Sequence, residues 1–357
     1  MNRKRFITLA VLLALLVVIY SQRGTLVMTI MDRGMPTILA GDPAAELGDG
    51  LHIAVCGAGG PMPDPKRSGA CLMIIAGENR IIVDSGSGGA RNINRMRLGI
   101  GTIDAVLLTH FHSDHIDGLG EVATLRWASA ANISPLPVIA PQGVETVVEG
   151  FNRSYNFDTQ YRHDHHGDTV APLSGKGMVA QPFPAPEGGE SVIVWDQDDL
   201  KVTAFEVDHK PVTPAVGYRF DYRGRSLAIS GDTIRSANLE HFSRDVDILF
   251  HEALNMEMIN TMNKSAQSIG NPVIAKVAYD IVDYHTSPVD AAKSAAAAGA
   301  KHLALYHIVP PIIFPGQAAA FMAGVNQVYD GPTTLTEDGM IFSLPANSTA
   351  INTSNGF

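Results

Sequence analysis

Four apolar segments of this 357-residue chain each end in a histidine or an aspartate, and this pattern restricts the fold more than any other feature. The segments are "LLTH", "FEVDH", "AISGD" and "LALYH", which end at His110, His209, Asp232 and His307. Short apolar runs of this kind are typical of buried β-strands. Polar side chains at the ends of neighbouring strands converge, so the sequence predicts one polar site assembled from distant parts of the chain.

The first of these strand ends carries the densest cluster. The stretch "LLTHFHSDHIDG" places His110, His112, Asp114 and His115 within six residues, although the whole chain has only 13 histidines. Extended residues at i and i+2 point to the same side, so His110 and His112 can share one ion while Asp114 and His115 reach a second. Imidazole and carboxylate together suit zinc and similar ions. A solvated polar turn is the alternative interpretation.

Predicted strands and helices alternate in two series, one before residue 142 and one after residue 191. The segment 152–189 between them is polar and rich in Gly and Pro, and we expect a long surface loop or lid there. In the second series, Ser287 and Asp290 form a capping box and Gly299 marks the end of that helix. Two mixed β/α halves predict an α/β fold in which two sheets pack face to face with helices outside.

The N-terminus predicts a membrane segment. The basic start "MNRKR" precedes an apolar run from Phe6 to Tyr20, and no small-x-small cleavage site follows. We expect an uncleaved anchor over 1–23, a connector over 24–50, a globular domain over 51–345 and a C-terminal tail over 346–357. Basic residues stay cytoplasmic, so the domain would be extracytoplasmic, and periplasmic in a bacterium. Secretion after cleavage is the alternative; a buried helix is disfavoured because the run lacks a polar face.

Charge and cysteine content limit the partners. The formal net charge is −10, and no Lys/Arg run occurs beyond the first five residues, so we expect no nucleic-acid partner. Cys56 and Cys71, the only cysteines, flank the loop "GAGGPMPDPKRSGA". They either pair across this loop or serve as two small buried side chains. Neither belongs to a CxxC motif, which disfavours a cysteine zinc site.

Taken in order, these motifs resemble those of the metallo-β-lactamase superfamily. "THFHSDH" matches its signature, and "IIVDSGSG", "ISGDT" and "LALYHIVP" match further motifs, over roughly residues 50–345. The resemblance implies a four-layer αβ/βα sandwich with a dinuclear zinc site at one sheet edge. It assigns one ion to His110, His112 and His209, the other to Asp114, His115 and His307, with Asp232 between them and Asp84 as structural support behind the ligands.

A dinuclear site of this kind implies hydrolysis. Two adjacent divalent ions lower the pKa of a shared water towards 7, so hydroxide becomes available as the nucleophile at neutral pH. Asp114 would then be both a ligand and part of the catalytic centre. The sequence contains no competing nucleophilic Ser or Cys motif.

The second half resembles the branch that contains ribonuclease Z and the zinc-dependent arylsulfatases, through "SGDT", "LFHEAL" and "YHTS". This resemblance implies that His285 lies near the substrate as a proton donor or anion ligand, and that Glu252 orients it. A surface histidine before a helix is the alternative for His285. Arg67, in a Gly/Pro loop similar to that of the arylsulfatases, is a candidate to bind a substrate anion, and a solvated loop arginine is its alternative.

Three departures from ribonuclease Z favour another substrate. Only 23 residues separate His209 from Asp232, which leaves no room for a tRNA-clamping arm. His307 is followed by "IVPP", and the N-terminal segment would export the domain. We therefore expect a small anionic ester, an aryl sulfate ahead of a phosphodiester. A ribonuclease Z-type phosphodiesterase and a lactone or β-lactam hydrolase are the alternatives. The histidines of "YRHDHHGD" (161–168) are disfavoured as a further metal site because seven ligands already serve two ions.

Overall fold

The computed structural model describes residues 3–41 and 43–357, which form two compact units, one up to Pro43 and one from Ala44 to Phe357. Met1 and Asn2 of the basic start and Asp42 of the expected connector lie outside the described residues. The N-terminal unit is one helix, α1 (Arg3–Ala40), which continues through much of the expected connector. Its segment Val11–Thr37 is apolar and long enough to cross a membrane, and none of it is buried.

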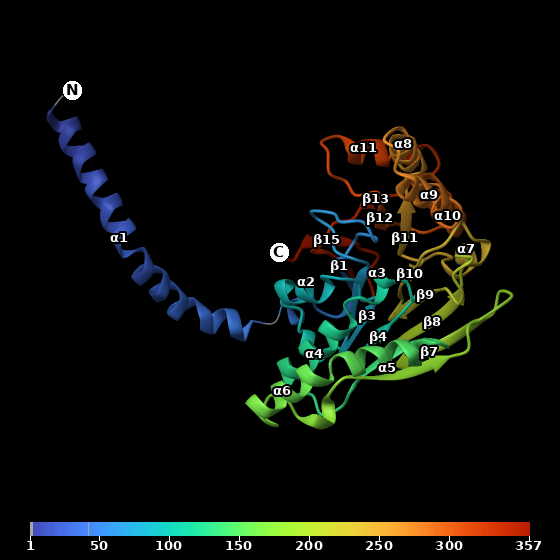
Figure 1. Cartoon of the computed structure of the whole chain (residues 1–357), viewed down its shortest axis with the longest axis horizontal. Helices are drawn as coiled ribbons and strands as arrows, with labels where there is room; N and C mark the ends of the chain where they lie inside the picture. Colours follow the sequence, from blue (N-terminus) through green and yellow to red (C-terminus); the bar gives the residue numbers. More distant parts are fainter. Residues whose placement is uncertain (1–2, 42) are drawn as a thin grey trace. The chain divides into compact units, whose positions relative to one another are not determined.

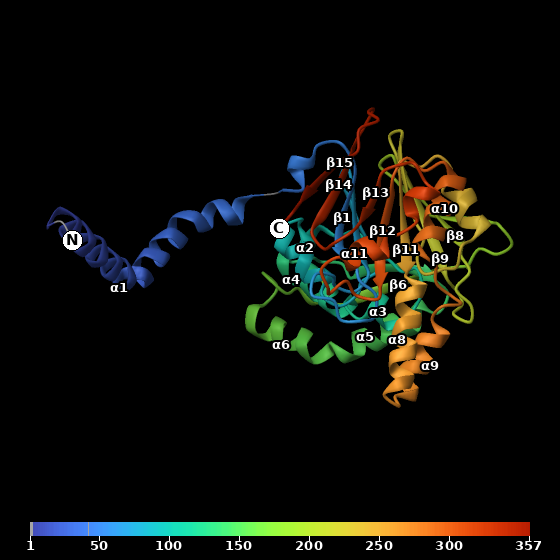
Figure 2. The same cartoon turned by 90° about the horizontal axis from the view of Figure 1, so that it is seen from above.

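The second unit contains two mixed β-sheets (Figures 1 and 2). The first sheet has eight strands, in the spatial order β15 (Asn352–Asn355), β14 (Met340–Pro345), β1 (Gly50–Gly57), β2 (Cys71–Ala76), β3 (Asn79–Val83), β4 (Ala105–Leu107), β5 (Leu136–Pro141) and β6 (Met178–Phe183). The second has seven, in the order β13 (Thr333–Leu335), β12 (Leu303–Val309), β11 (Ile248–Leu254), β10 (Arg225–Ile229), β9 (Val216–Tyr222), β8 (Leu200–Glu206) and β7 (Ser191–Gln197).

The main core lies between the two sheets. Leu51 and Ile53 of β1 pack in one apolar cluster with Val202, Tyr218 and Phe250 of the second sheet. Strand β1 is buried along its whole length, because helices cover the outer face of its sheet. Burial on both faces explains why these strands appear in the sequence as continuous apolar runs rather than as alternating patterns.

Helices form the two outer layers, which confirms the predicted four-layer sandwich of two mixed sheets. The first sheet is covered by α2 (Gly89–Met96), α4 (Leu119–Ala130) and α5 (Val144–Ser154). The second is covered by α7 (Ala237–Phe242), α10 (Pro288–Ala298) and α11 (Gln317–Phe321). Helix α10 has the predicted ends: the Ser287 hydroxyl accepts a hydrogen bond from the Asp290 N–H at 3.1 Å, and Gly299 ends the helix with φ +67°.

The expectation of a long loop over 152–189 is wrong. Helix α5 extends to Ser154, α6 spans Asn156–His166, and β6 follows as an edge strand. Helix α6 lacks an apolar stripe, so hydrophobic periodicity could not reveal it. It is supported instead by i,i+4 pairs such as Arg162 with Asp158 at 2.7 Å. At the other end of the chain, the expected C-terminal tail adds β15 to the edge of the first sheet.

Cys56 and Cys71 form a disulfide, which resolves the alternative left open by the sequence. The bond joins the end of β1 to the start of β2 and closes the Gly/Pro loop between them. Both residues are also fully buried, so they contribute to the core as well.

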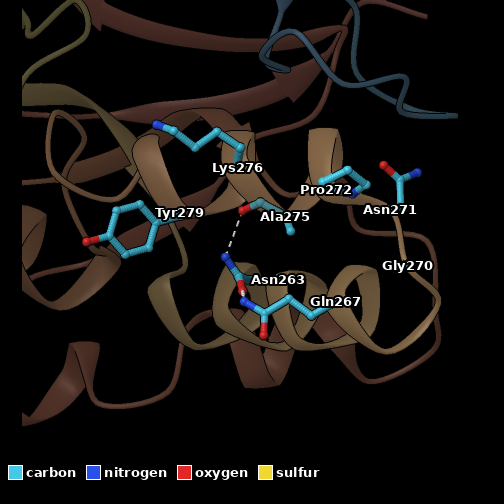
Figure 3. Close-up of a pocket in the computed structure, with 8 residues that line it drawn as sticks. All are labelled: Asn263, Gln267, Gly270, Asn271, Pro272, Ala275, Lys276 and Tyr279. Atoms are coloured by element: carbon cyan, nitrogen blue, oxygen red, sulfur yellow. Dashed lines mark hydrogen bonds between the residues drawn. The ribbon is translucent and has the colours of Figure 1, made fainter.

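Helices α8 (Met256–Ser268) and α9 (Pro272–Asp280) form a hairpin after β11. The Asn263 side chain donates a hydrogen bond to the Ala275 carbonyl at 2.8 Å and joins the two helices (Figure 3). A cavity of about 730 Å³ lies in this hairpin, with Lys276 as the charged side chain on its wall. None of the predicted metal ligands lines it.

Candidate metal centre

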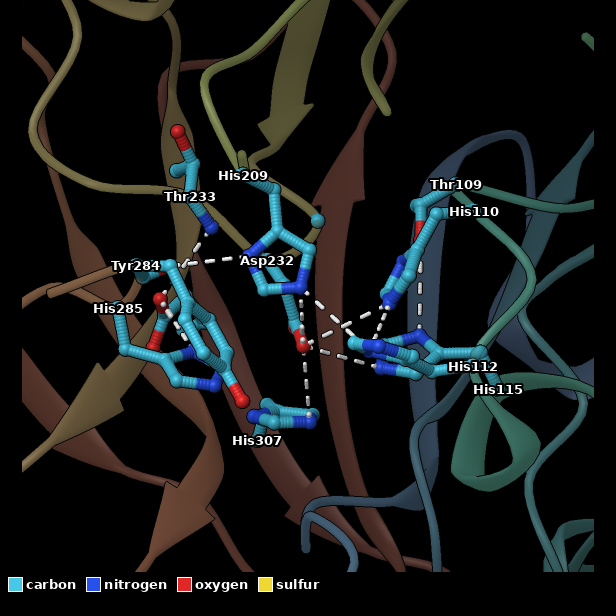
Figure 4. A network of polar contacts seen from close by, with 12 residues as sticks. Thr109, His110, His112, His115, His209, Asp232, Thr233, Tyr284, His285 and His307 are labelled. Carbon is cyan, nitrogen blue, oxygen red and sulfur yellow. Dashed lines mark hydrogen bonds and ion pairs between the residues drawn. The ribbon is translucent and has the colours of Figure 1, made fainter. Parts of the chain in front are cut away.

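All seven predicted ligands meet at one edge of the sandwich. Figure 4 shows six of them, the five histidines and Asp232. His110 and His112 follow β4, and Asp114 and His115 lie in the short helix α3 (Ser113–Ile116). His209 follows β8, and Asp232 follows β10. Because β8 and β10 both run antiparallel to β9, their carboxyl ends lie at the same sheet edge. Gly231, with φ +62°, makes the turn that presents Asp232, and a Cβ there would lie 2.8 Å from the Val216 carbonyl oxygen.

His307 reaches the site by a different route from the one expected. Strand β12 does not end at His307 but continues to Val309. Glu252 pairs with Tyr306 and Ala253 pairs with Ile308, so His307 is the extra residue of a β-bulge. Its φ of 48° lies in the left-handed region. A bulge redirects a side chain without ending the strand, and here it turns the imidazole towards Asp232.

Asp232 lies at the centre of the cluster. Its Oδ2 atom is 3.4 Å from the Nε2 atoms of both His115 and His307. The same oxygen is 3.8 Å from His110 Nε2 and 3.9 Å from His209 Nε2. One carboxylate oxygen therefore faces histidines from both halves of the fold. This is the position that a carboxylate shared by two ions would occupy.

Two ligand groups surround this carboxylate. The first contains His110, His112, His209 and Asp232, and the second contains Asp114, His115 and His307. Within the first, His110 Nε2 lies 3.0 Å from His112 Nδ1; within the second, His307 Nε2 lies 3.1 Å from Asp114 Oδ2. Asp232 and His307 also group with His285, which is not one of the predicted ligands. The six other predicted ligands divide as the family resemblance implied, which placed Asp232 between the two ions.

The chemistry of the cluster fits two divalent ions. Buried His115 Nε2 and Asp232 Oδ1 find no hydrogen-bond partner among the described residues. Burial, reinforced by the neighbouring His115, lowers the pKa of His110 well below its usual range, and burial also lowers the pKa of His209. At His115 and His307 the Asp232 carboxylate outweighs burial and raises the pKa, that of His307 to about 9, so these two imidazoles must lose a proton to bind an ion. Neutral imidazoles with free lone pairs are the form that binds a metal.

Residues behind the ligands fix their orientation. Asp84 accepts hydrogen bonds from the Thr109 N–H at 2.8 Å and the Thr109 hydroxyl at 2.9 Å, and it lies 2.8 Å from His115 Nδ1. This geometry agrees with the supporting role implied for Asp84. Two supports were missed from the sequence. The Thr109 hydroxyl lies 3.0 Å from His110 Nδ1, and the Tyr284 carbonyl lies 2.9 Å from His209 Nδ1. Of these two supports, only Thr109 could have been predicted from the sequence, because it directly precedes the first candidate ligand, His110.

Glu252 and His285 form a buried pair beside the metal ligands. Glu252 Oε1 lies 3.0 Å from His285 Nδ1 and accepts hydrogen bonds from the N–H groups of Thr286 and Thr233 at 2.9 and 3.3 Å. A nitrogen of His285 lies within 4.8 Å of ligand atoms of Asp232 and His307. Burial lowers the pKa of His285, but the Glu252 carboxylate outweighs this effect and raises it above the usual value. His285 is therefore no surface histidine.

Two other predicted features lie away from the centre. The guanidinium of Arg67 is buried, donates to the Thr336 carbonyl at 2.8 Å and pairs with Asp64 and Glu337, each at 3.5 Å. These internal bonds replace the substrate contact considered for Arg67. His163 Nδ1 lies 2.9 Å from the Ala171 carbonyl oxygen. Within 3–41 and 43–357, the histidines of α6 join no group of three ligands.

A small polar cavity of about 270 Å³ adjoins the centre at His209. Glu187, Glu206 and Asp208 line it, together with Lys210. Acidic side chains thus outnumber basic ones on this side of the centre.

A buried two-part ligand set at the edge of an αβ/βα sandwich defines a metal-dependent hydrolase. Residues 64–294 match the model of the metallo-β-lactamase superfamily. The chain belongs to this superfamily, in the branch related to ribonuclease Z.

Sequence relatives support this branch. The chain is 33% identical to ribonuclease Z of Mycolicibacterium gilvum over 290 residues, which cover 81% of this chain and 94% of the relative. It is 32% identical to ribonuclease Z of Mycobacterium bovis over 81% of this chain and 96% of that relative. The crystal structure of the short form of human tRNase Z matches with a TM-score of 0.59 at 20% identity, over 82% of this chain and 99% of that one. This last likeness concerns the fold.

Proposed function

We propose that the protein is a dinuclear zinc-dependent phosphodiesterase. The observation that carries this proposal is the 33% identity to a ribonuclease Z over 94% of that enzyme's length, with the complete ligand set in place. A relative of this extent supports a phosphodiester as the substrate, ahead of the aryl sulfate favoured by the sequence motifs. No observation specifically favours a lactone or β-lactam.

Two divalent ions, if bound by these ligands, would supply an activated water and neutralise charge on the group under attack. The protein contributes orientation and proton transfer. Asp84 and Thr109 hold the imidazoles of His115 and His110 from behind, as partners of metal-bound histidines commonly do. Glu252 fixes His285 through Nδ1, which leaves Nε2 to donate a proton to the leaving oxygen. His285 and Asp114 are thus proposed as catalytic residues, and Glu252 as a positioning residue.

The proposed substrate is a small phosphodiester rather than a tRNA. The relatives named ribonuclease Z make RNA the competing candidate. However, the chain carries a net charge of −10, and the polar cavity at His209 is lined by three carboxylates, Glu187, Glu206 and Asp208, against one lysine. A polyanion needs clustered basic side chains to offset its phosphates. The short connection between His209 and Asp232 folds into β9 and β10 and leaves no arm there to hold a tRNA.

We further propose that α1 anchors the enzyme in a membrane, with the metal centre on the extracytoplasmic side. The exposed apolar segment Val11–Thr37 supports anchoring, and the basic residues at its start favour this orientation. The Cys56–Cys71 disulfide supports the same compartment, because structural disulfides persist in oxidising environments and are rare in the cytosol.

One panel of substrates tests the proposed function. The purified, zinc-loaded full-length protein is offered bis-p-nitrophenyl phosphate, p-nitrophenyl sulfate, nitrocefin, a lactone and a precursor tRNA. We expect hydrolysis of the phosphodiester, loss of that activity in Asp232→Ala, and a lower zinc content in Asp232→Ala and His112→Ala by elemental analysis. Turnover of the sulfate, nitrocefin or the lactone alone would contradict the proposal. Precise cleavage of the tRNA would support the ribonuclease alternative.

A further inference from the structure

A second, apolar cavity shares no lining residue with the polar cavity at His209. Its volume is about 700 Å³, within the range of small-molecule binding sites. Three segments form it: the loop after β1 with Met62, helix α8 with Met258 and Met262, and the segment after β12 with Pro311, Ile313 and Phe314. Glu257 is the only charged side chain among its described lining residues.

Two chain segments lead from the metal centre to this apolar cavity: Pro310, which lines the cavity, follows His307 by three residues, and Met62 follows Gly60 by two. A Cβ at Gly60 would lie 3.0 Å from His307 Cε1 and 2.8 Å from a Val309 methyl group, so the loop backbone rests directly on the ligand. The Ile308 N–H donates to the Ala58 carbonyl at 2.9 Å and fixes this loop to β12. Met62 lies only two residues beyond Gly60, a reach of roughly 7 Å at full extension. No candidate ligand lines the cavity itself, but two of its walls begin within three residues of His307 or of the loop backbone that rests on it.

The side chains of the cavity suit a hydrocarbon group. Phe314 and Ile313 remain 68% and 55% exposed, so their apolar surface is left for a ligand to cover. Methionine side chains adapt to ligands of different shape, and α8 contributes two of them, Met258 and Met262. A phosphate or sugar group has no basic partner among these lining residues. The apolar α1 would also keep the enzyme close to a lipid phase, where amphiphilic esters accumulate.

We propose that this cavity binds the apolar substituent of the substrate, so that the enzyme acts on amphiphilic phosphodiesters with an aryl or alkyl ester group. The inference rests on the proposed phosphodiesterase function and specifies its substrate class. The phosphate would lie at the metal centre, and the hydrocarbon group would extend past Gly60 towards Met62 and Phe314. The cavity thereby becomes a determinant of specificity rather than part of the catalytic centre.

A series of substrates with one leaving group tests the cavity. Methyl, butyl and phenyl p-nitrophenyl phosphates are compared with the zinc-loaded full-length protein in phospholipid nanodiscs. Burial of one methylene group should raise kcat/KM about fourfold. The butyl ester has three more methylenes than the methyl ester, so its kcat/KM should be higher by up to roughly 60-fold. In Phe314→Ala we expect this preference to fall several-fold while the methyl ester is hydrolysed at an unchanged rate. Met258→Glu should suppress the butyl preference further.

Phe157→Ala is the matched control, because Phe157 is similarly exposed at 71% but lies on α6, outside the cavity. It should leave the butyl preference unchanged. Equal kcat/KM for the methyl and butyl esters in the wild-type protein would overturn the inference, as would a butyl preference that survives both Phe314→Ala and Met258→Glu.

Failure of the underlying function is separable from failure of the cavity proposal. If no phosphodiester is hydrolysed, calorimetry with butylphosphonate and methylphosphonate still measures the cavity. Tighter binding of butylphosphonate, lost in Phe314→Ala and kept in Phe157→Ala, would support the cavity while the phosphodiesterase function fails. Equal binding of the two phosphonates would overturn the cavity as well.

Discussion

The pairing of Glu252 with His285 shows how single residues prepare the site for proton transfer. Glu252 is fully buried and its Oε1 faces three donors, the His285 ring and the N–H groups of Thr286 and Thr233. A buried carboxylate with these contacts cannot turn away, so it fixes the tautomer and the direction of the imidazole. The position of His285 beside Asp232 and His307 follows from this restraint.

Replacement of His285 by Ala should lower kcat by about 10²–10⁴-fold for phosphodiesters with poor leaving groups, because a positioned general acid typically contributes that factor. The loss should be small for a p-nitrophenyl ester, since nitrophenolate needs little protonation. Both ions should stay bound, as elemental analysis would show. Steady-state kinetics with a series of leaving groups measures the difference.

His302→Ala is the control for this prediction. His302 is buried to the same degree as His285, with 8% against 9% exposure, but it faces Thr334 away from the metal centre. It should leave kcat unchanged for every substrate. Equal losses for good and poor leaving groups in His285→Ala would remove His285 from the acid role.

Among the elements, the loop between β1 and β2 is the one that links folding most directly to the site. The disulfide closes this loop at its base. Asp338 holds both of its ends, since its carboxylate accepts from the Ala58 N–H at 3.0 Å and the Ser68 N–H at 2.8 Å. Gly60, near the start of the loop, rests on His307. The covalent bond therefore stabilises a segment that touches a metal ligand.

The double variant Cys56→Ser, Cys71→Ser should lower the free energy of unfolding by about 3 kcal/mol, the value that loop closure predicts for a separation of 15 residues. Urea unfolding followed by circular dichroism measures the change. Dithiothreitol should destabilise the wild-type protein by a similar amount and leave the double variant unaffected. A wild-type protein whose stability is insensitive to complete reduction would contradict this role for the disulfide.

At the scale of the whole molecule, the chain combines an apolar helix with a metallohydrolase unit. None of the potential membrane span of the helix is buried. The two units are separate compact bodies. Anchoring and catalysis can therefore be tested independently.

Protease treatment of spheroplasts should degrade the metallohydrolase unit, and cell fractionation should find the protein in the membrane, because the basic residues at the start of α1 should keep that end in the cytoplasm. A cytoplasmic reporter protein serves as the control for intact spheroplasts. Protection of the metallohydrolase unit from protease would refute the proposed topology. A shortened soluble form would indicate cleavage of the N-terminal segment instead.

The sequence, with the family resemblance that its motifs carry, predicted the candidate ligand set and the sandwich. The spacing of His110, His112, Asp114 and His115 after an apolar strand is a local property, and strands buried on both faces are continuous apolar runs. The caps of α10 were equally local, because a capping side chain binds the backbone three residues away.

Tertiary structure alone decided the features that depend on partners distant in the sequence. The bulge at His307 arises from the register between β11 and β12. Arg67 was considered for the substrate because its partner Glu337 is 270 residues away and invisible to local reasoning. Helix α6 was missed because its sequence has no helical periodicity of apolar residues. The pairing of Cys56 with Cys71 depends on β1 and β2 being neighbours in the sheet. Local sequence patterns predict which residues belong to a helix, strand or motif. Strand register and packing then decide which distant residues they contact.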